Sequence, residues 1–181
     1  RIRVGVLYGG RYAEHDVSVL SARNVFAAID RERFDVLPIA VTKAGHWLLV
    51  EPGREGQAIS NDGVPVALAP GGKGGFITGR PGVAPAPIDV LFPVLHGPFG
   101  EDGSVQGYAE VADVAYVGCG VFGSAAAMDK GMAKRLLSEA GIAVARARRL
   151  ERGEAVSFDD LVGALGSPVF LKPASQGSSF G

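Results

Sequence analysis

The sequence predicts an α/β protein built on an open parallel β-sheet. Three apolar runs support this prediction, because strands that are buried on both faces read as nearly continuous hydrophobic segments. These runs lie at residues 2–8, 34–41 and 88–95. A helical pattern lies between the first two runs and gives a β–α–β order. That order implies a parallel pair of strands joined by a right-handed crossover.

The other elements of this first unit follow from periodicity and turn residues. After Gly9 and Gly10, apolar residues fall largely on one face of a helix, namely Val17, Leu20, Val25, Phe26 and Ile29. A short strand is expected at residues 46–51. Glycine and proline crowd residues 52–87, which predicts a long loop or a small hairpin. A helix that ends near Val111 and a short strand after it complete the unit.

A second unit is expected to begin near Met128, so we divide the chain into residues 1–125 and 126–181. Ser124 is predicted to cap a helix that runs from Ala125 to Ala140. The first unit is the open α/β sheet, and the second is expected to be unfinished.

The rest of the second unit alternates between strand and helix signals. Residues 144–150 alternate apolar and basic side chains, which predicts a half-exposed strand of another sheet. Ser157 is expected to cap a short helix, with Asp160 three residues later. Residues 168–173 are predicted to form a strand that enters the loop ASQGSSFG, and we expect the chain to stop partway through that loop.

The composition argues against several classes of partner. The chain has 18 Lys and Arg against 19 Asp and Glu, so charge gives no reason to expect nucleic acid or a membrane surface as partner. No apolar run reaches the length of a membrane span, and we expect a cytoplasmic protein. The single cysteine, Cys119, is expected to be a buried, unreactive thiol in a reducing compartment.

Three loops that directly follow strands are candidate sites, because open α/β sheets bind ligands at that edge. In the first, residues 9–18, Glu14 lies near the start of a helix. It either complements the helix dipole or pairs with the ammonium group of a substrate, and local chemistry does not choose between the two.

The second loop, residues 95–103, contains His96 and three glycines that allow a ligand to approach the backbone. The structural alternative is a loop histidine with Glu101 and Asp102 as solvated or helix-start acids. Adjacent acids could also suggest a metal site, but neighbours in sequence usually point apart. We therefore expect no metal ligands within this chain.

The third loop, residues 171–181, places Lys172 before small and polar residues. Such a loop can offer backbone N–H groups and a positive charge to phosphate oxygens, although a surface turn would look the same. Lys130 lies on a helix at the junction of the two units, where it is either a solvated lysine or a ligand contact.

Four segments in order resemble the D-alanine–D-alanine ligase family of ATP-grasp enzymes: GGRYAEHDVSVLSA, VLHGPFGEDGSVQG, GSAAAMDKGMAK and LKPASQGSSFG. The resemblance covers essentially the whole chain. It implies an amino-terminal substrate-binding domain at residues 1–125 and the first part of an ATP-grasp domain at 126–181. It also implies an ATP-dependent ligase that joins two D-alanines through an acyl phosphate for peptidoglycan synthesis.

The resemblance also implies roles for individual residues. Glu14 would receive the ammonium of the first D-alanine, with Val17 and His96 in the same subsite. Ser178 would link this subsite to the active site. The residues implied for the ATP phosphates are Lys130, Lys172, Ser178 and Ser179. The ligands of Mg²⁺ would lie beyond Gly181, and the family is typically dimeric.

Some alternatives remain open at this stage. A D-alanine–D-lactate ligase shares these motifs, and a non-catalytic module that binds a D-amino acid is a reading from another class. Another ATP-grasp carboxylate–amine ligase is disfavoured by the segment HGPFGEDG. The chain departs from the family pattern at Tyr12, where a small serine is usual, and at Asp16, where Glu is more common. We expect the 181-residue chain by itself to lack ligase activity.

Overall fold

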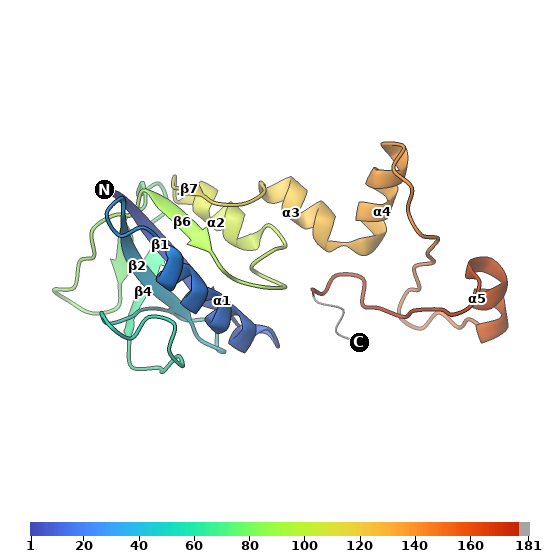
Figure 1. The fold of residues 1–181 in the computed structure, drawn as a ribbon, viewed down its shortest axis with the longest axis horizontal. Coiled ribbons are helices and arrows are strands. Elements are labelled where there is room, and N and C mark those ends of the chain that lie inside the picture. Colours follow the sequence, from blue (N-terminus) through green and yellow to red (C-terminus); the bar gives the residue numbers. More distant parts are fainter. Residues whose placement is uncertain (178–181) are drawn as a thin grey trace.

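The structure is a computed structural model that describes residues 1–177, and it has the α/β architecture that the sequence predicts (Figure 1). The elements in chain order are β1 (Ile2–Gly9), α1 (His15–Ala28), β2 (Phe34–Val41), β3 (Trp47–Leu49), β4 (Val64–Leu68), β5 (Phe76–Thr78), β6 (Val90–Pro93), α2 (Ser104–Val111), β7 (Ala115–Tyr116), α3 (Val121–Met128), α4 (Lys130–Glu139) and α5 (Phe158–Leu165).

The strands form a seven-stranded sheet in the order β5-β4-β3-β2-β1-β6-β7. Strands β2, β1, β6 and β7 are parallel neighbours, as predicted. The sheet also has an antiparallel edge, which the sequence indicated only as a possible small hairpin, because β3, β4 and β5 pair antiparallel. The cause is chain length: only residues 42–46 separate β2 from β3, and a parallel connection needs about a dozen residues or more.

The glycine-rich segment at residues 52–87 is the small hairpin insertion, not a structureless loop. Its strands β4 and β5 pair through three residues on each strand. The connecting turn is closed by the N–H of Gly72, which donates to the carbonyl of Ala69 at 2.9 Å, and by the N–H of Ala69, which donates to Gly75. The sheet therefore gains its antiparallel edge from this insertion.

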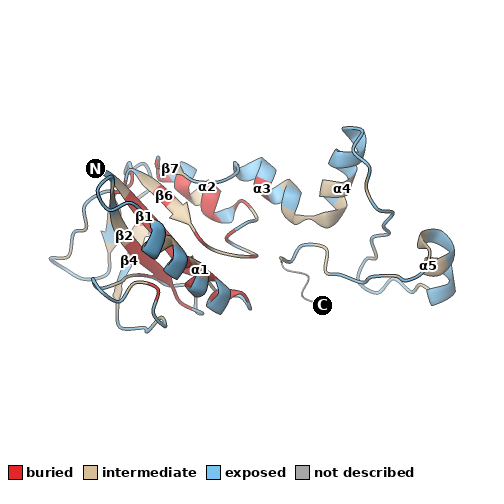
Figure 2. Cartoon of the chain, in the orientation of Figure 1, coloured by how far each residue is buried: buried red, intermediate tan, exposed pale blue. Residues whose placement is uncertain are grey.

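The sheet has a hydrophobic core on each face. Helix α2 contributes Val105 and Ala109 to one core, which also contains Leu7, Leu91 and Ala112, the residue that caps the end of α2. Helix α1 contributes Val19 and Ala22 to the other core, on the opposite face. Figure 2 shows the buried residues gathered in the sheet and on the inner sides of these two helices. The sheet is therefore the middle layer of a three-layer sandwich.

The predicted buried face of α1 is partly wrong. Val17 and Leu20 are 52% and 57% exposed, whereas His15 and Ser18 are buried. The hydroxyl of Ser18 accepts a hydrogen bond from the N–H of Gly9 at 2.8 Å and donates to the carbonyl of Val94 at 2.5 Å. Peptide groups at the ends of buried strands need polar partners. The buried face of α1 therefore includes Ser18, although an apolar pattern alone would predict only hydrophobic residues there.

Two helices replace the single predicted helix at residues 125–140. Helix α3 contains Ser124, so Ser124 caps nothing, and Asp129 lies between α3 and α4 with an extended backbone. The carboxylate of Asp129 accepts hydrogen bonds from the N–H groups of Gly131 and Met132, both at 2.9 Å. The N–H of Met132, with the nearby charge of Arg149, holds the pKa of Asp129 below its ordinary value.

The strands predicted at residues 144–150 and 168–173 are absent from the structure. A strand needs a hydrogen-bonded neighbour, and neither segment has one within residues 1–177.

The helix cap at Ser157 is confirmed, since its hydroxyl accepts from the N–H of Asp160 at 3.0 Å. Figure 1 shows α3 and α4 leading away from the sheet, with α5 at the far end. No residue from 125 to 177 is buried.

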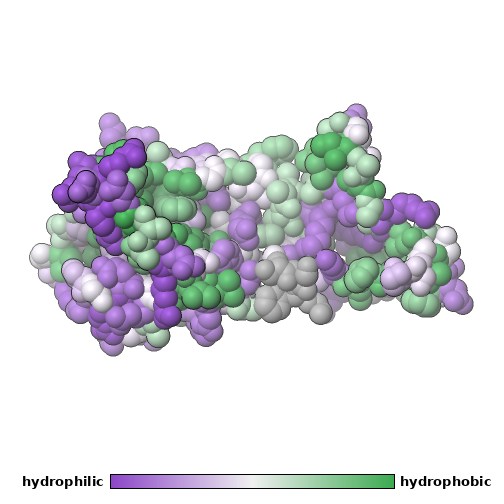
Figure 3. All heavy atoms as spheres, viewed as in Figure 1, coloured by the Kyte–Doolittle hydropathy of each residue, from purple (hydrophilic) through white to green (hydrophobic). Residues whose placement is uncertain are grey.

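This part of the chain is also where apolar side chains reach the surface. Figure 3 shows green patches over α4 and near α5. The exposed apolar residues there include Met132, Leu136, Phe158, Phe170 and Leu171. None of the helices formed by residues 1–177 combines the length and the apolarity that crossing a membrane requires.

The prediction of a buried Cys119 is wrong. Cys119 lies in the short connection between β7 and α3, outside both hydrophobic cores, and its neighbours at residues 117–120 are exposed as well. The connection runs along the surface, so the thiol is accessible.

The loop that joins β6 to α2 is closed by the carboxylate of Asp102. This carboxylate accepts hydrogen bonds from the N–H of Phe99 at 2.9 Å and from the N–H of Ser104 at 3.0 Å. Burial raises the pKa of Asp102, but these N–H groups outweigh burial and hold that pKa below its ordinary value. Asp102 is therefore a structural acid of the loop.

Leu91 tests the core on the α2 face. It is fully buried in β6, so we expect Leu91→Ala to lower the free energy of unfolding by about 2–5 kcal/mol, because a cavity remains. Ile77→Ala on the exposed edge strand β5 is the control and should change that free energy by about 0.5 kcal/mol or less. Urea unfolding measures both. Equal losses for the two variants would contradict the assignment of the core.

Asp102 gives a pH-dependent expectation. Because its pKa is lowered on folding, its stabilisation is present above the pKa of the unfolded carboxyl, about 3.9, and is lost as the pH falls through the folded value. We expect Asp102→Asn to be less stable than the parent at neutral pH and to approach it in acid. Urea midpoints measured across pH check this. A stability difference that does not vary with pH would count against the N–H contacts.

Candidate functional site

The candidate site lies where the parallel strands β1 and β6 end, at neighbouring positions of the sheet. Gly9 ends β1 and Gly10 follows it, with φ angles of 99° and 116°, which residues with side chains rarely adopt. A Cβ on Gly9 would also collide with the carbonyl oxygen of Val41. The diglycine therefore lets the chain turn tightly from β1 into α1.

Glu14 immediately precedes α1, and its side chain is only 7% exposed. The carboxylate does not cap the helix, and no donor within residues 1–177 forms a hydrogen bond to it. Burying a carboxylate without a partner is costly. Of the two readings of Glu14, an anion that awaits a cationic ligand therefore fits the geometry better than a simple helix-dipole contact.

Two glycines from distant segments enclose the Glu14 carboxylate. A Cβ built on Gly97 would lie 3.0 Å from Oε1 of Glu14, and one built on Gly177 would lie 2.7 Å from the same atom. The first glycine follows β6, and the second belongs to the last described turn of the chain. The structure therefore brings parts of the first, second and third predicted loops to one carboxylate oxygen.

His96 lies in the second loop, one residue before Gly97. Its Nε2 is 3.0 Å from the hydroxyl of Ser21 on α1. The next residue, Gly97, donates its N–H to Oε2 of Glu101 at 2.6 Å, and the N–H of Glu101 returns a hydrogen bond to the carbonyl of Gly97 at 2.9 Å. Glu101 is thus not merely a solvated acid, because it fixes the peptide that follows His96.

Gln106 fastens the same loop from α2. Its Nε2 donates to the carbonyl of Gly100 at 2.9 Å, while its buried Oε1 has no hydrogen-bond partner among the described residues. Nothing in the sequence pointed to Gln106, and Glu101 was expected only as a solvated, helix-start or metal-binding acid. Both residues lie a few positions after a glycine of the loop, but only the folded loop shows which peptide group each side chain binds.

The segment at residues 174–177 is held against the start of α4. The backbone N–H of Lys130 donates to the carbonyl of Ala174 at 2.9 Å, and Nζ of Lys130 donates to the carbonyl of Gln176 at 2.6 Å. Lys172 lies exposed at the beginning of this segment. Lys130 and the third loop are therefore together, as a shared phosphate site requires, whereas Ser178 and Ser179 lie outside the described residues.

Val17 lies near Glu14 in sequence but is half-exposed on the outer side of α1. Its predicted place in the substrate subsite stays a prediction.

Tyr12 preserves the turn before α1, since its carbonyl accepts the N–H of His15 at 3.0 Å. Its ring lies 5.6 Å from the ring of Phe99, and the guanidinium of Arg11 lies 5.5 Å from that ring. This cluster ties the first loop to the second.

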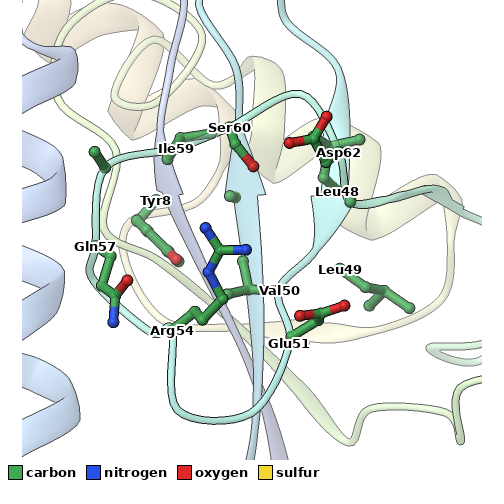
Figure 4. Close-up of a pocket in the computed structure, with 13 residues that line it drawn as sticks. Tyr8, Leu48, Leu49, Val50, Glu51, Arg54, Gln57, Ile59, Ser60 and Asp62 are labelled. Carbon is green, nitrogen blue, oxygen red and sulfur yellow. The ribbon is translucent and has the colours of Figure 1, made fainter.

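Two pockets accompany this region. One, of about 240 Å³, contains His96 and is lined mainly by apolar side chains, with Trp47, Phe99 and Tyr108 among them. The other, of about 70 Å³, lies under the loop at residues 51–63 (Figure 4). It is lined by Tyr8 and Arg54 but by none of the predicted site residues. Burial raises the pKa of Tyr8, despite the N–H of Gly56 that donates to its hydroxyl.

The described residues also contain acids that could suggest a metal. Within residues 1–177, however, no group of three or more His, Cys, Asp or Glu side chains is arranged to hold a metal ion. Glu101 and Asp102 are occupied with backbone N–H groups of their own loop. The site that the fold assembles is therefore an enclosed carboxylate next to a lysine-held loop.

Comparisons with known proteins show the family to which the chain belongs. A family model described as D-ala D-ala ligase N-terminus matches residues 3–119. D-alanine--D-alanine ligase A of Mesorhizobium japonicum is 61% identical over 188 residues, covering 100% of this chain and 52% of the relative. The protein of the same name from Brucella suis biovar 1 is 49% identical over 184 residues, again covering 100% of this chain and 52% of the relative.

Solved structures give the same result. The VanG D-Ala:D-Ser ligase of Enterococcus faecalis superposes with a TM-score of 0.82 at 34% identity, covering 99% of this chain and 54% of that one. The D-alanine-D-alanine ligase of Coxiella burnetii gives 0.86 at 29% identity, covering 99% and 53%. The chain spans about half the length of the curated relatives it matches. From its matched residues and its fold, this chain belongs to the D-alanine–D-alanine ligase family and corresponds to the amino-terminal half of its relatives.

Proposed function

We propose that this chain supplies the first-substrate subsite and part of the ATP site of an enzyme that joins two D-alanines. In the proposed reaction, the carboxylate of the first D-alanine attacks the γ-phosphorus of ATP, the bond from that phosphorus to the bridging oxygen breaks, and ADP leaves, which gives an acyl phosphate. The amine of the second D-alanine then attacks the acyl carbon, and phosphate leaves. Such chemistry depends on positioning and charge neutralisation, and it needs no nucleophile from the protein.

The enclosed carboxylate of Glu14 is the observation that supports this proposal most strongly. It is buried without a cationic partner within residues 1–177. An ammonium group would supply both the missing charge and the missing hydrogen-bond donors. An amino acid held there by its ammonium would lie next to His96 and the peptide of Gly97. We propose that this amino acid is the first D-alanine.

The ATP side of the proposal rests on the loop beside Lys130. Phosphate oxygens accept hydrogen bonds from ammonium groups and peptide N–H groups, and Lys130, Lys172 and the loop at residues 174–177 offer these donors. The hydrogen bond from Nζ of Lys130 to Gln176 could be exchanged for a phosphate oxygen. Glu14 and Glu101 would repel phosphate, so we place it on the α4 side of the loop.

Other parts of the proposal concern the longer protein. Mg²⁺ would be held by residues beyond Gly181 and would help to neutralise the charge of the ATP phosphates, and Ser178 and Ser179 would add contacts from the loop. Ser178 would also join the Glu14 subsite to the active site. We further propose a cytoplasmic homodimer that acts in peptidoglycan precursor synthesis, with no nucleic acid or membrane as partner.

Two alternatives keep the same first subsite. The VanG relative is a D-Ala:D-Ser ligase, so the second substrate could be D-alanine, D-serine or D-lactate. Initial rates with each of these at saturating D-alanine and ATP decide among them. A non-catalytic D-amino-acid-binding module is the remaining candidate, and ATP-dependent phosphate release by the full-length protein would exclude it.

Glu14→Gln tests the first subsite. We expect this change to raise the KM of the first D-alanine about 10-fold to 1000-fold, because the ammonium loses its counter-charge. The KM of ATP should stay within about twofold of the parent, a change worth less than about 0.5 kcal/mol. Glu32→Gln, at an exposed glutamate before β2, is the matched control. Unchanged use of the first D-alanine would remove Glu14 from the subsite.

Lys172→Ala tests the phosphate loop. We expect the KM of ATP to rise about 10-fold or more, because one positive charge beside the phosphates is lost. The affinity for D-alanine should change little. Lys43→Ala, which removes an exposed lysine that lies 3.8 Å from Asp16, is the matched control. An ATP dependence equal to that of the control variant would favour a surface turn at residues 171–177.

A further inference from the structure

We propose that Gly177 is a positioning residue for the first substrate, because its missing side chain leaves the space that the Glu14 carboxylate occupies. This inference rests on the proposed function, in which Glu14 receives the ammonium group. It assigns Gly177 to the amino-acid subsite, although the loop to which it belongs is otherwise read as a phosphate loop.

The distances around Gly177 support the inference. A Cβ at this position would lie 2.7 Å from Oε1 of Glu14, 3.3 Å from Cα of Gly97 and 3.5 Å from Oε2 of Glu101. The first distance is shorter than a non-bonded carbon–oxygen contact allows, whereas the third is an ordinary contact. A methyl group at residue 177 would therefore press first on the carboxylate that is proposed to bind substrate.

The requirement at Gly177 is one of space and not of backbone conformation. Gly97, the other glycine beside Glu14, has a φ of 73°, so a side chain there would strain the backbone as well. Gly177 does not have a φ in that left-handed region. Alanine can adopt its backbone conformation, so Gly177→Ala changes the contact with Glu14 without forcing the turn to refold.

The structure also indicates which group would move. The turn before Gly177 is held by Lys130 through two hydrogen bonds, from its N–H to Ala174 and from its Nζ to Gln176. The Glu14 carboxylate, in contrast, lies at the end of a flexible side chain and has no hydrogen bond to any described residue. The carboxylate should therefore yield to an added methyl group, and the turn should stay.

This arrangement has a consequence for the two ligands. Gln176 and Gly177 are adjacent in the chain. The carbonyl of Gln176 accepts a hydrogen bond from Lys130, which is proposed to bind phosphate, whereas Gly177 lies beside Glu14, which is proposed to bind the ammonium group. Gly177→Ala should accordingly separate the two functions, with a loss at the amino-acid subsite and little change for ATP.

The experiment uses the full-length ligase and three measurements: the KM of the first D-alanine, the Kd of ATP and the Tm. For Gly177→Ala we expect the KM of the first D-alanine to rise about 10-fold to 100-fold, since displacements of about 1 Å have effects of this size. The Kd of ATP should stay within about twofold and the Tm should stay near that of the parent, since a twofold change is worth less than about 0.5 kcal/mol. Gly163→Ala, at a glycine of α5 with open space around its Cβ position, is the matched control. It should leave the KM and the Kd unchanged, and its Tm should equal or slightly exceed that of the parent, because alanine favours a helix.

A double-mutant cycle with Glu14→Asp separates the steric contact from a general effect of the loop. The shorter aspartate withdraws its carboxylate from residue 177, so Gly177→Ala should raise the KM of the first D-alanine much less in the Glu14→Asp background. Effects of two contacting residues are expected to be non-additive in this way.

The outcomes are distinguishable. An unchanged KM for Gly177→Ala, or effects that multiply independently in the cycle, would overturn the role of Gly177. A loss of ATP affinity as large as the loss for D-alanine would overturn it as well, and would return Gly177 to the phosphate loop alone. If Glu14→Gln itself leaves the first D-alanine unaffected, the proposed function fails, whatever Gly177→Ala does.

Discussion

A carboxylate that is buried without a cationic partner among residues 1–177 is the constraint on which the other features of this site depend. Glu14 is 7% exposed, and the two peptide segments beside it contribute glycines in place of side chains. Such a group is stable in a folded protein only if a ligand or water supplies the missing donors. The fold brings three distant loops to this carboxylate and fixes each loop by other contacts, so the enclosure is formed before any ligand arrives.

Three polar side chains hold the loops of the site in position through hydrogen bonds. Ser18 joins the end of β1 to the segment after β6 through two hydrogen bonds, which sets the positions of the first and second loops. Glu101 holds the peptide of Gly97, and Lys130 holds the turn before Gly177. Each of these residues is polar and forms a hydrogen bond with a peptide group, whereas the Glu14 carboxylate has no hydrogen bond to the part of the chain that the structure describes. A site that is preorganised in this way loses little entropy when it binds.

The sequence predicted the parts of the fold that depend on local patterns. The apolar runs became β1, β2 and β6, and Ser157 caps α5. It did not predict the antiparallel edge, because strand direction depends on the length of the connection at residues 42–46. It misplaced the buried face of α1, because Ser18 is buried for its hydrogen bonds. Two predicted strands in residues 144–173 are absent, since strands need neighbours that local pattern does not supply.

For the site, the sequence named Glu14, His96 and Lys130, because each lies at a loop after a strand or at a helix start. It could not name Gly177 as a partner of Glu14, since these residues belong to segments far apart in the chain. It treated Glu101 as a solvated, helix-start or metal-binding acid, because only the folded loop shows that its carboxylate accepts the N–H of Gly97. The most direct test of the account is a crystal structure of the full-length ligase with D-alanine and a non-hydrolysable ATP analogue. We predict that the ammonium nitrogen of the first D-alanine lies about 3 Å from Oε1 of Glu14. An ammonium bound to a different carboxylate, with Glu14 outside hydrogen-bond distance, would contradict it.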